Sequence, residues 1–456
     1  METAQEQYDR MTKTPVSKLI IKLSIPTILS MLGTTIYNLV DTAFVGTLGN
    51  SASGAVGVVF GLMAILQAIG FMFGQGGGSI LSRRLGEKNV NEATVVASTG
   101  FFCSLSVAIV VSLLCLIFIN PLMMLLGSTE TIKPFARTYA YFILFAAPLM
   151  VTSFTLNNYL RYEGKAVLGM IGLMTGGFLN IFGDAIFMFG LKMGIAGAGL
   201  STAISQVISF SILLSMFLRG KTQTKLSIRK VRIKGGLIFD IMSTGFPSLL
   251  RQSLGSLSTI VMNFEAARFA GDVAVAAMSI VSRVSFGLFS VALGIGQGFQ
   301  PVCGFNYGAG KYKRLRDGYR FTIFLSETAM IILSLVALIF SDGVIEIFRD
   351  DVDVIRIGTR ALRLLCTAQM LLPFCMVTEM LMQSSGKKGV ASFLSSLRGG
   401  ILYIPALLIL PIFRGLNGVQ EAQPLAYVLS VIPAIYYARK FFAKLPKEDR
   451  KEEEPI

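Results

Sequence analysis

The stretch SIPTILSMLGTTIYNLVDTAFVG, residues 24–46, decides the fold class of this chain. A membrane-spanning helix needs about 20 mostly apolar residues, and this stretch is long enough to form one. Near its end it contains a carboxylate, Asp41. A charge at membrane depth is costly unless it is paired or faces a water-filled cavity, and such residues usually serve a function. Asp41 is therefore a candidate functional residue of a membrane protein.

The composition extends this interpretation to the whole chain. Of its 456 residues 53% are hydrophobic and only 15% are charged, against about 25% in soluble domains. About twelve segments are long and apolar enough to span a membrane. They lie near residues 19–45, 54–80, 93–119, 133–160, 166–190, 195–218, 237–269, 274–304, 318–341, 355–383, 389–412 and 418–438. The sequence predicts an all-α membrane protein.

The basic residues are distributed as membrane topology requires. The net charge is +15, but Lys and Arg collect in alternate loops, most densely at 219–234, whereas the loop at 342–353 is acidic. This is the positive-inside pattern, and with an even number of spans it predicts that both termini are cytoplasmic. We therefore expect a multi-pass protein of a bacterial or archaeal plasma membrane, in contact with lipid and not with nucleic acid.

The chain also repeats itself at a nearly constant interval. Gly74-Gln75-Gly76 recurs 222 residues later as Gly296-Gln297-Gly298, near the end of a span in both cases. Further pairs lie 221 or 222 residues apart, namely Pro26 and Pro247, Gly164 and Gly386, and Gly194 and Gly415. The sequence thus predicts two six-helix bundles, residues 1–218 and 237–445, joined by a basic linker at 219–236 and followed by a charged tail at 446–456.

Two bundles of six helices enter the membrane from the same side, so we expect them to be related by a pseudo-two-fold axis along the membrane normal. Secondary transporters are built in this way and work by alternating access. The phosphate-binding pattern G-x-x-x-x-G-K-[ST] is absent, so transport must be driven by an ion gradient or run downhill. The glycines among residues 74–78 are better explained by close helix packing than by phosphate binding.

Enzyme chemistry has little support. The chain has no histidine, and its five cysteines form no C-x-x-C pair, so neither a zinc site nor a disulfide framework is indicated. We expect no catalytic residues and no cofactor. Without histidine, carboxylates must carry any protons or cations that move through the protein.

The two halves, the stretch at 24–46, the repeated Gly-Gln-Gly and LNIFGDAIFMFGLKMGIAGAGLSTAISQ at 179–206 together resemble the multidrug and toxic compound extrusion (MATE) family over essentially the whole chain. The resemblance implies a secondary multidrug efflux transporter, expected to be a monomer, that exports cationic or amphipathic compounds in exchange for H⁺ or Na⁺. The alternative is a flippase for lipid-linked precursors from the same superfamily, which would usually have extra spans and a cavity richer in arginine.

A candidate cation site lies in the amino-terminal half. Asn180 and Asp184 are four residues apart and so lie on one face of a helix, and Ala198 and Thr202 have the same spacing. Hard cations such as Na⁺ prefer carboxylate, amide, hydroxyl and carbonyl oxygens. Asp41, Asn180, Asp184, Thr202 and the carbonyl of Ala198 supply all four kinds, and the resemblance places these positions together. The same carboxylates can take protons instead, so the choice between H⁺ and Na⁺ stays open.

The carboxyl-terminal half has its own acids, Glu265 and Glu379. The resemblance implies that Glu265 belongs to a cation site of that half, with Glu379 in place of an expected aspartate, and either can contact substrate. The alternative is a buried salt bridge from Glu265 to Arg268 or Arg283.

Tyr37 and Tyr139 are candidates for lining the cavity, since aromatic rings can stack on cations, and Asn157 is a third candidate for the lining. Pro26 removes one helical hydrogen bond and can kink the first span, so it is a candidate hinge.

Overall fold

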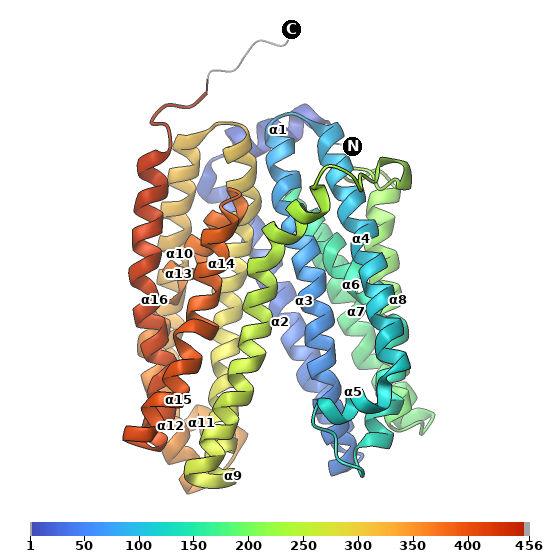
Figure 1. Ribbon diagram of the computed structural model, residues 1–456, viewed down its shortest axis with the longest axis vertical. Helices are drawn as coiled ribbons and strands as arrows, with labels where there is room; N and C mark the ends of the chain where they lie inside the picture. Colours follow the sequence, from blue (N-terminus) through green and yellow to red (C-terminus); the bar gives the residue numbers. More distant parts are fainter. Residues whose placement is uncertain (1, 451–456) are drawn as a thin grey trace. The chain divides into compact units, whose positions relative to one another are not determined.

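The structure is a computed structural model that describes residues 2–450 (Figure 1). Within that range it is built from helices, without a β-strand. The α-helices are α1 (Ala4–Lys13), α2 (Val16–Gly46), α3 (Asn50–Gly86), α4 (Val90–Ile117), α5 (Ile119–Leu125), α6 (Lys133–Tyr162), α7 (Ala166–Asp184), α8 (Ile195–Leu218), α9 (Leu237–Gly308), α10 (Tyr312–Ile339), α11 (Ser341–Phe348), α12 (Val352–Gln369), α13 (Leu372–Ser384), α14 (Lys388–Ser396), α15 (Tyr403–Arg414) and α16 (Leu416–Lys444). Two π-helical segments, η1 (Ala185–Gly190) and η3 (Leu397–Ile401), and one 3₁₀ turn, η2 (Ile228–Lys230), complete the set. The predicted all-α class is confirmed.

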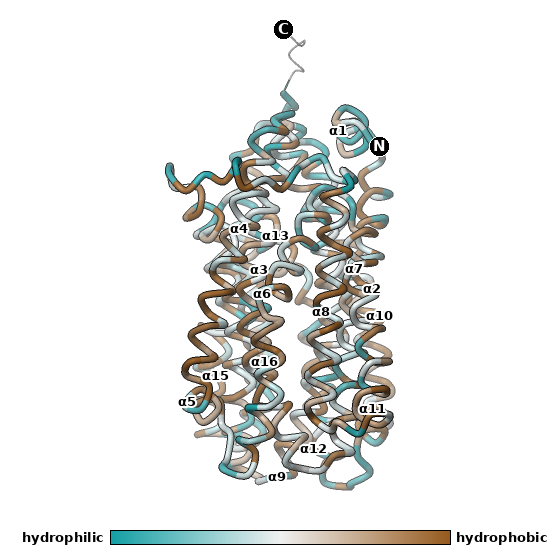
Figure 2. The backbone as a smooth tube through the Cα atoms, turned by 90° about the vertical axis from the view of Figure 1, so that its right-hand side faces the viewer, coloured by the Kyte–Doolittle hydropathy of each residue, from teal (hydrophilic) through white to brown (hydrophobic). Residues whose placement is uncertain are grey.

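The long helices coincide with the predicted spans. Among the described residues nine helices are long and apolar enough to cross a membrane, or ten if α12 and α13, bent by 49°, form one span. The 72-residue α9 covers two predicted spans, because its helical geometry breaks at Ala270 and Gly271. Helix α16 covers the last predicted span but does not pass the same test of hydropathy. Figure 2 shows hydrophobic residues concentrated along the long helices.

The internal repeat is also present in the backbone. Gly194 has φ 58° and ψ −136°, and Gly415, 221 residues later, has φ 57° and ψ −138°. Gly164 and Gly386 have φ values of 77° and 76°. Side chains disfavour these left-handed conformations, which explains why both members of each pair are glycine. The two halves therefore share local backbone geometry and not only sequence spacing.

The chain packs as two compact units whose ranges differ from the predicted bundles. Among the described residues, the first unit comprises those up to Lys13 and Leu29–Leu249, and the second comprises Thr14–Ile28 and those from Leu250 to Arg450. The first part of α2 thus packs with the second unit, and the first part of α9 with the first. Both changes of unit occur two residues after a repeated proline, Pro26 or Pro247. The linker at 219–236 belongs to the first unit, and part of the predicted tail, 451–456, lies outside the described residues.

The repeated Gly-Gln-Gly motifs leave room for the start of α9 in the first unit and for the start of α2 in the second. In the first unit a Cβ added to Gly76 of α3 would clash with the carbonyl oxygen of Ile241 at the start of α9. In the second unit a Cβ added to Gly298 of α9 would clash with Ser24 at the start of α2. The predicted role of these glycines in close helix packing is therefore right, and small residues of this kind let helix backbones approach.

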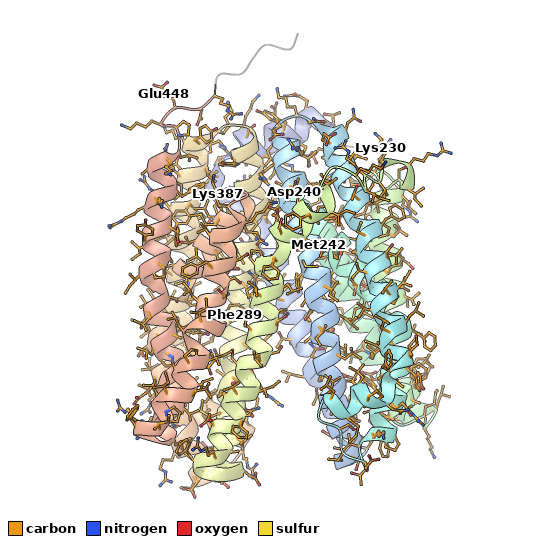
Figure 3. The ribbon with its side chains drawn as sticks, viewed as in Figure 1. Lys230, Asp240, Met242, Phe289, Lys387 and Glu448 are labelled. Carbon is orange, nitrogen blue, oxygen red and sulfur yellow. The ribbon has the colours of Figure 1, made fainter. Side chains whose placement is uncertain are left out.

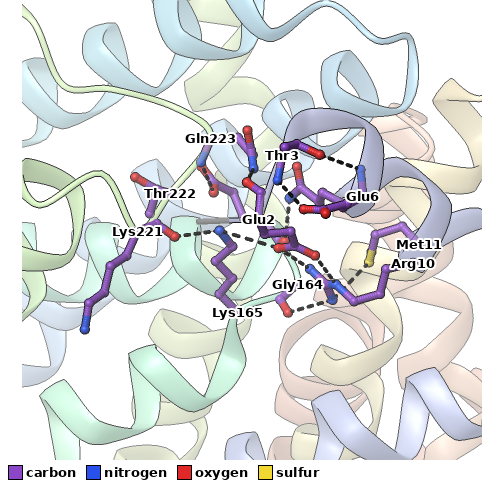
Figure 4. Close-up of polar contacts among 12 residues, drawn as sticks. Glu2, Thr3, Glu6, Arg10, Met11, Gly164, Lys165, Lys221, Thr222 and Gln223 are labelled. Carbon is purple, nitrogen blue, oxygen red and sulfur yellow. Dashed lines mark hydrogen bonds and ion pairs between the residues drawn. The ribbon is translucent and has the colours of Figure 1, made fainter.

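The N-terminal helix α1 is attached to the first unit by a polar cluster (Figure 4). The carboxylate of Glu2 accepts from Arg10 Nε at 2.6 Å and lies 3.7 Å from Lys165 Nζ. Gln223 Nε2 in the linker donates to the main-chain oxygen of Glu2 at 2.6 Å, and Arg10 Nη1 donates to that of Gly164 at 3.2 Å. These contacts join α1, the α6–α7 turn and the linker.

Candidate functional site

Helices α7 and α8 of the first unit are joined along a seam of small residues. Ser209 Oγ of α8 donates to the carbonyl oxygen of Gly172 on α7 at 3.0 Å. One turn further along α7, a Cβ added to Gly176 would lie 2.9 Å from Ser209 Cβ and 3.2 Å from the carbonyl oxygen of Ser205. The absence of side chains at the two glycines thus lets the helices approach closely, and the next residue on this face of α7 is Asn180.

Asn180 links α7 to α8 at the end of this seam. Its Nδ2 lies 3.4 Å from Asp184 Oδ1, 3.3 Å from Ser201 Oγ and 3.2 Å from Thr202 Oγ1, while Ser201 Oγ donates to the Asn180 carbonyl at 3.0 Å. The predicted neighbours Asn180, Asp184 and Thr202 are therefore in contact, and Ala198, fully buried, lies one turn before Thr202 on α8. The sequence analysis missed Ser201.

Asp41 of α2 joins the same cluster. Asp41 is only 3% exposed and Asp184 is fully buried. The Asp41 carboxyl group accepts from the hydroxyl of Tyr139 at 3.5 Å and lies within interaction range of the Asp184 carboxyl group. Asp41 Oδ1 and Asp184 Oδ2 are buried and have no hydrogen-bond partner among the described residues. A buried acceptor without a donor is destabilising, so the pair is suited to sharing a proton or a cation.

Two cavities of the first unit adjoin this cluster. One has a volume of about 20 Å³ and is lined by Asn180, Thr202 and Tyr37 among others, which is room for about one water-sized guest. The other, about 240 Å³ and mostly apolar, lies between α2 and α7 and is also bordered by Tyr37. Asn157 instead lies against Gly169, eleven residues before Asn180, which is about 16 Å along α7.

The local backbone changes at the candidate site. Asp184 is the last residue of α7, and the π-helix η1 begins at the next residue. Such segments are rare and often occur at functional sites. The described residues contain no group of three or more His, Cys, Asp or Glu side chains that could hold a metal ion. The donor set therefore has two carboxylates, an amide and hydroxyls, which fits a proton or a hard monovalent cation better than a divalent transition metal.

The acids of the second unit have different surroundings. Glu265 is buried, and its Oε2 lies 3.6 Å from Nη1 of Arg268, whose side chain is 61% exposed. Glu379 is 1% exposed and lies between two arginines, at 2.5 Å from Arg251 Nη1 and 3.4 Å from Arg398 Nη2. The two arginines at Glu379 were not predicted, and both form ion pairs with it.

A comparison with known families shows which family the chain belongs to. The sequence model of the MatE family matches residues 26–186 and again residues 247–409, so both halves of the chain match the same family. The chain belongs to the MatE family. It is therefore a multi-pass membrane transporter and not an enzyme.

Individual relatives agree over nearly the full length. The chain is 26% identical to the multidrug export protein MepA of Staphylococcus aureus (strain MSSA476), over 94% of this chain and 95% of that protein. It is 26% identical to MepA of Staphylococcus saprophyticus, with the same coverage. Among solved structures, an outward-facing multidrug resistance MATE transporter of the MOP superfamily is 25% identical, with a TM-score of 0.91, over 96% of this chain and 98% of that one.

Proposed function

We propose that this protein is a secondary active efflux transporter that exports amphipathic and cationic compounds in exchange for H⁺ or Na⁺. The observation that supports it best is the pair Asp41 and Asp184. Both carboxyl groups are buried within membrane-spanning helices, and each has an oxygen without a donor. Intramembrane carboxylates of this kind are typical of ion and proton pathways.

The remaining donors suit the same role. Asn180 and Thr202 supply an amide and a hydroxyl oxygen beside the acids, and the small cavity that they line has room for about one ion or water. A proton or Na⁺ at this site would compensate one of the two negative charges and reduce the repulsion between the carboxylates. The larger apolar cavity bordered by Tyr37 is suited to the body of an amphipathic compound, because apolar surface is favourably removed from water there.

We propose that alternating access couples export of the compound to entry of H⁺ or Na⁺. Pro26 and Pro247 each lack the N–H that an uninterrupted helix would use, and each lies two residues before the point where its helix changes unit. Bending at these positions would let each unit move while its own core stays intact. A relative solved in an outward-facing conformation supports such a cycle. We further propose a plasma-membrane location with both termini in the cytoplasm.

The test is transport by the purified protein in proteoliposomes, with pH and Na⁺ gradients imposed separately and ethidium as the reporter. Asp184→Asn removes one charge with almost no change in volume, so gradient-driven efflux should fall about tenfold or more, equivalent to 1.4 kcal/mol. Asp342→Asn, at an exposed acid, is the matched control and should transport normally. Full coupling in both Asp41→Asn and Asp184→Asn would exclude this pair from the mechanism.

A further inference from the structure

A third cavity is lined only by residues of the second unit and differs chemically from the acidic cluster of the first unit. Its volume is about 340 Å³, and it lies between α9, the α14–η3–α15 segment and α16. Its charged lining residues are Arg251 and Arg398, and no acid is among the residues that line it. The other lining residues include aromatic side chains and serines, among them Phe289, which Figure 3 labels on α9.

The charge balance of this cavity is positive. The side chains of Arg251 and Arg398 are each 8% exposed, and Glu379 behind them is the acid that both contact. Two guanidinium groups and one carboxylate give the cluster a net charge of +1. A guanidinium has five N–H donors, and Nε and Nη1 of Arg398 donate to none of the described residues. Arg398 therefore has donors left for a ligand, in a cluster whose charge is positive.

The backbone holds Arg398 in position. The residue belongs to the π-helix η3, whose Gly399 carbonyl accepts a hydrogen bond from Ser258 Oγ of α9. Its guanidinium carbon lies 5.3 Å from the centre of the Phe289 ring, within the range of a cation–π contact. A π-helical turn is rare and frequently marks a functional site. The guanidinium is thus fixed between an acid and a ring, with its remaining donors at the cavity.

We propose that this cavity binds the oxyanion group, carboxylate or phosphate, of an amphipathic aromatic compound. The planar fork of an arginine matches either group through paired hydrogen bonds, and an anion would compensate the excess charge. The rings of Phe286, Phe289 and Tyr403 can hold the aromatic body. An organic cation would be repelled here. The inference adds a substrate class, anions and zwitterions, to the proposed export function. Binding of the compound does not depend on that function; only its transport does.

The first test uses the unaltered full-length protein in detergent and measures binding without any gradient. Coumarin-3-carboxylate and coumarin-3-carboxamide have the same ring system and differ in charge, so calorimetry should show at least about tenfold tighter binding of the carboxylate. Phenyl phosphate is the second anionic probe. If it displaces the carboxylate, the site accepts phosphate groups such as those of lipid precursors; if it does not, the site selects carboxylates. Equal affinity for the carboxylate and the amide would overturn the proposal.

The second test removes one arginine. Arg398→Gln leaves Glu379 paired with Arg251, so the protein should fold, which its melting temperature checks. Carboxylate binding should weaken about tenfold or more, and binding of the carboxamide should not change. Asp184→Asn is the matched control, because it should lose coupled transport and still bind the carboxylate probe. Unchanged carboxylate affinity in a folded Arg398→Gln protein would refute the assignment, whatever the outcome of the transport experiment.

Discussion

Replacing Glu379 by Gln tests the charge balance of the second unit directly. The substitution keeps the shape of the side chain but removes the negative charge between Arg251 and Arg398. The net charge of the cluster then rises from +1 to +2, at a site where the carboxylate is 1% exposed and the two arginines are 8% exposed. Arg251 and Arg398 then both lose the carboxylate that they contact.

The expected loss of stability follows from the burial of all three groups. Removing one partner of a buried ion pair typically costs about 3–5 kcal/mol. In a unit of about 150–250 residues 1 kcal/mol shifts the melting temperature by roughly 2–4 °C, so the expected decrease is about 6–20 °C. Arg398→Gln alone leaves the neutral pair of Glu379 and Arg251, so it should cost much less. Combining the two substitutions restores a net charge of +1 and should recover much of the loss.

Thermal unfolding of the purified protein in detergent, followed by intrinsic fluorescence or light scattering, measures this decrease. Glu265→Gln is the matched control, since it applies the same chemical change to another buried glutamate of the unit. Its partner Arg268 is 61% exposed and 3.6 Å away, so water can solvate the arginine and the loss should stay below about 1 kcal/mol. A Glu379→Gln protein that melts within 2 °C of the unaltered protein, roughly the equivalent of 1 kcal/mol, would refute the electrostatic argument.

Two further substitutions test the packing and the N-terminal cluster. Gly76→Ala should lower the melting temperature because its Cβ would meet the α9 backbone, whereas Gly57→Ala on the same helix has nothing within 4 Å and should be neutral or slightly stabilising. Burial opposes ionisation of Glu2, but Arg10 and Lys165 hold the pKa of its carboxyl group below the ordinary value of 4.5. The contribution of Glu2 to the stability of the folded state is therefore present above about pH 4.5 and is lost as the pH falls. The hydrogen-exchange protection factors of the α1 amides, which are corrected for the intrinsic pH dependence of exchange, should therefore fall on acidification, and Glu2→Gln should remove that decrease.

Much of the fold could be predicted from the sequence because the membrane restricts what a chain can do. Backbone groups in lipid must be satisfied within a helix, so an apolar stretch of about 20 residues predicts a span with little ambiguity. The repeat could be predicted because glycines such as Gly194 and Gly415 are required wherever the backbone turns in the left-handed region. The packing of the first part of α2 with the second unit, and of the first part of α9 with the first unit, could not be predicted. Hydropathy contains no information on which neighbour a helix packs against.

The candidate site was predictable to the extent that it depends on spacing along one helix. Asn180 and Asp184 are four residues apart, and their contact follows from helix geometry. Ser201 was missed, although Ser201, Ser205 and Ser209 repeat every four residues and so indicate a polar seam on α8. The arginines at Glu379 are 128 and 19 residues away along the chain, and no local pattern indicates such contacts.

The two halves differ most where their side chains would meet a ligand. Each half contains a π-helical segment beside its charged cluster, η1 after Asp184 in the first unit and η3 around Arg398 in the second. The repeated glycines keep nearly identical backbone angles, because the fold dictates them. The charges are opposite in sign, and nothing in the backbone requires that difference. Ligand chemistry can explain it, since two buried carboxylates favour a cation or proton and a cavity with excess guanidinium groups favours an anion.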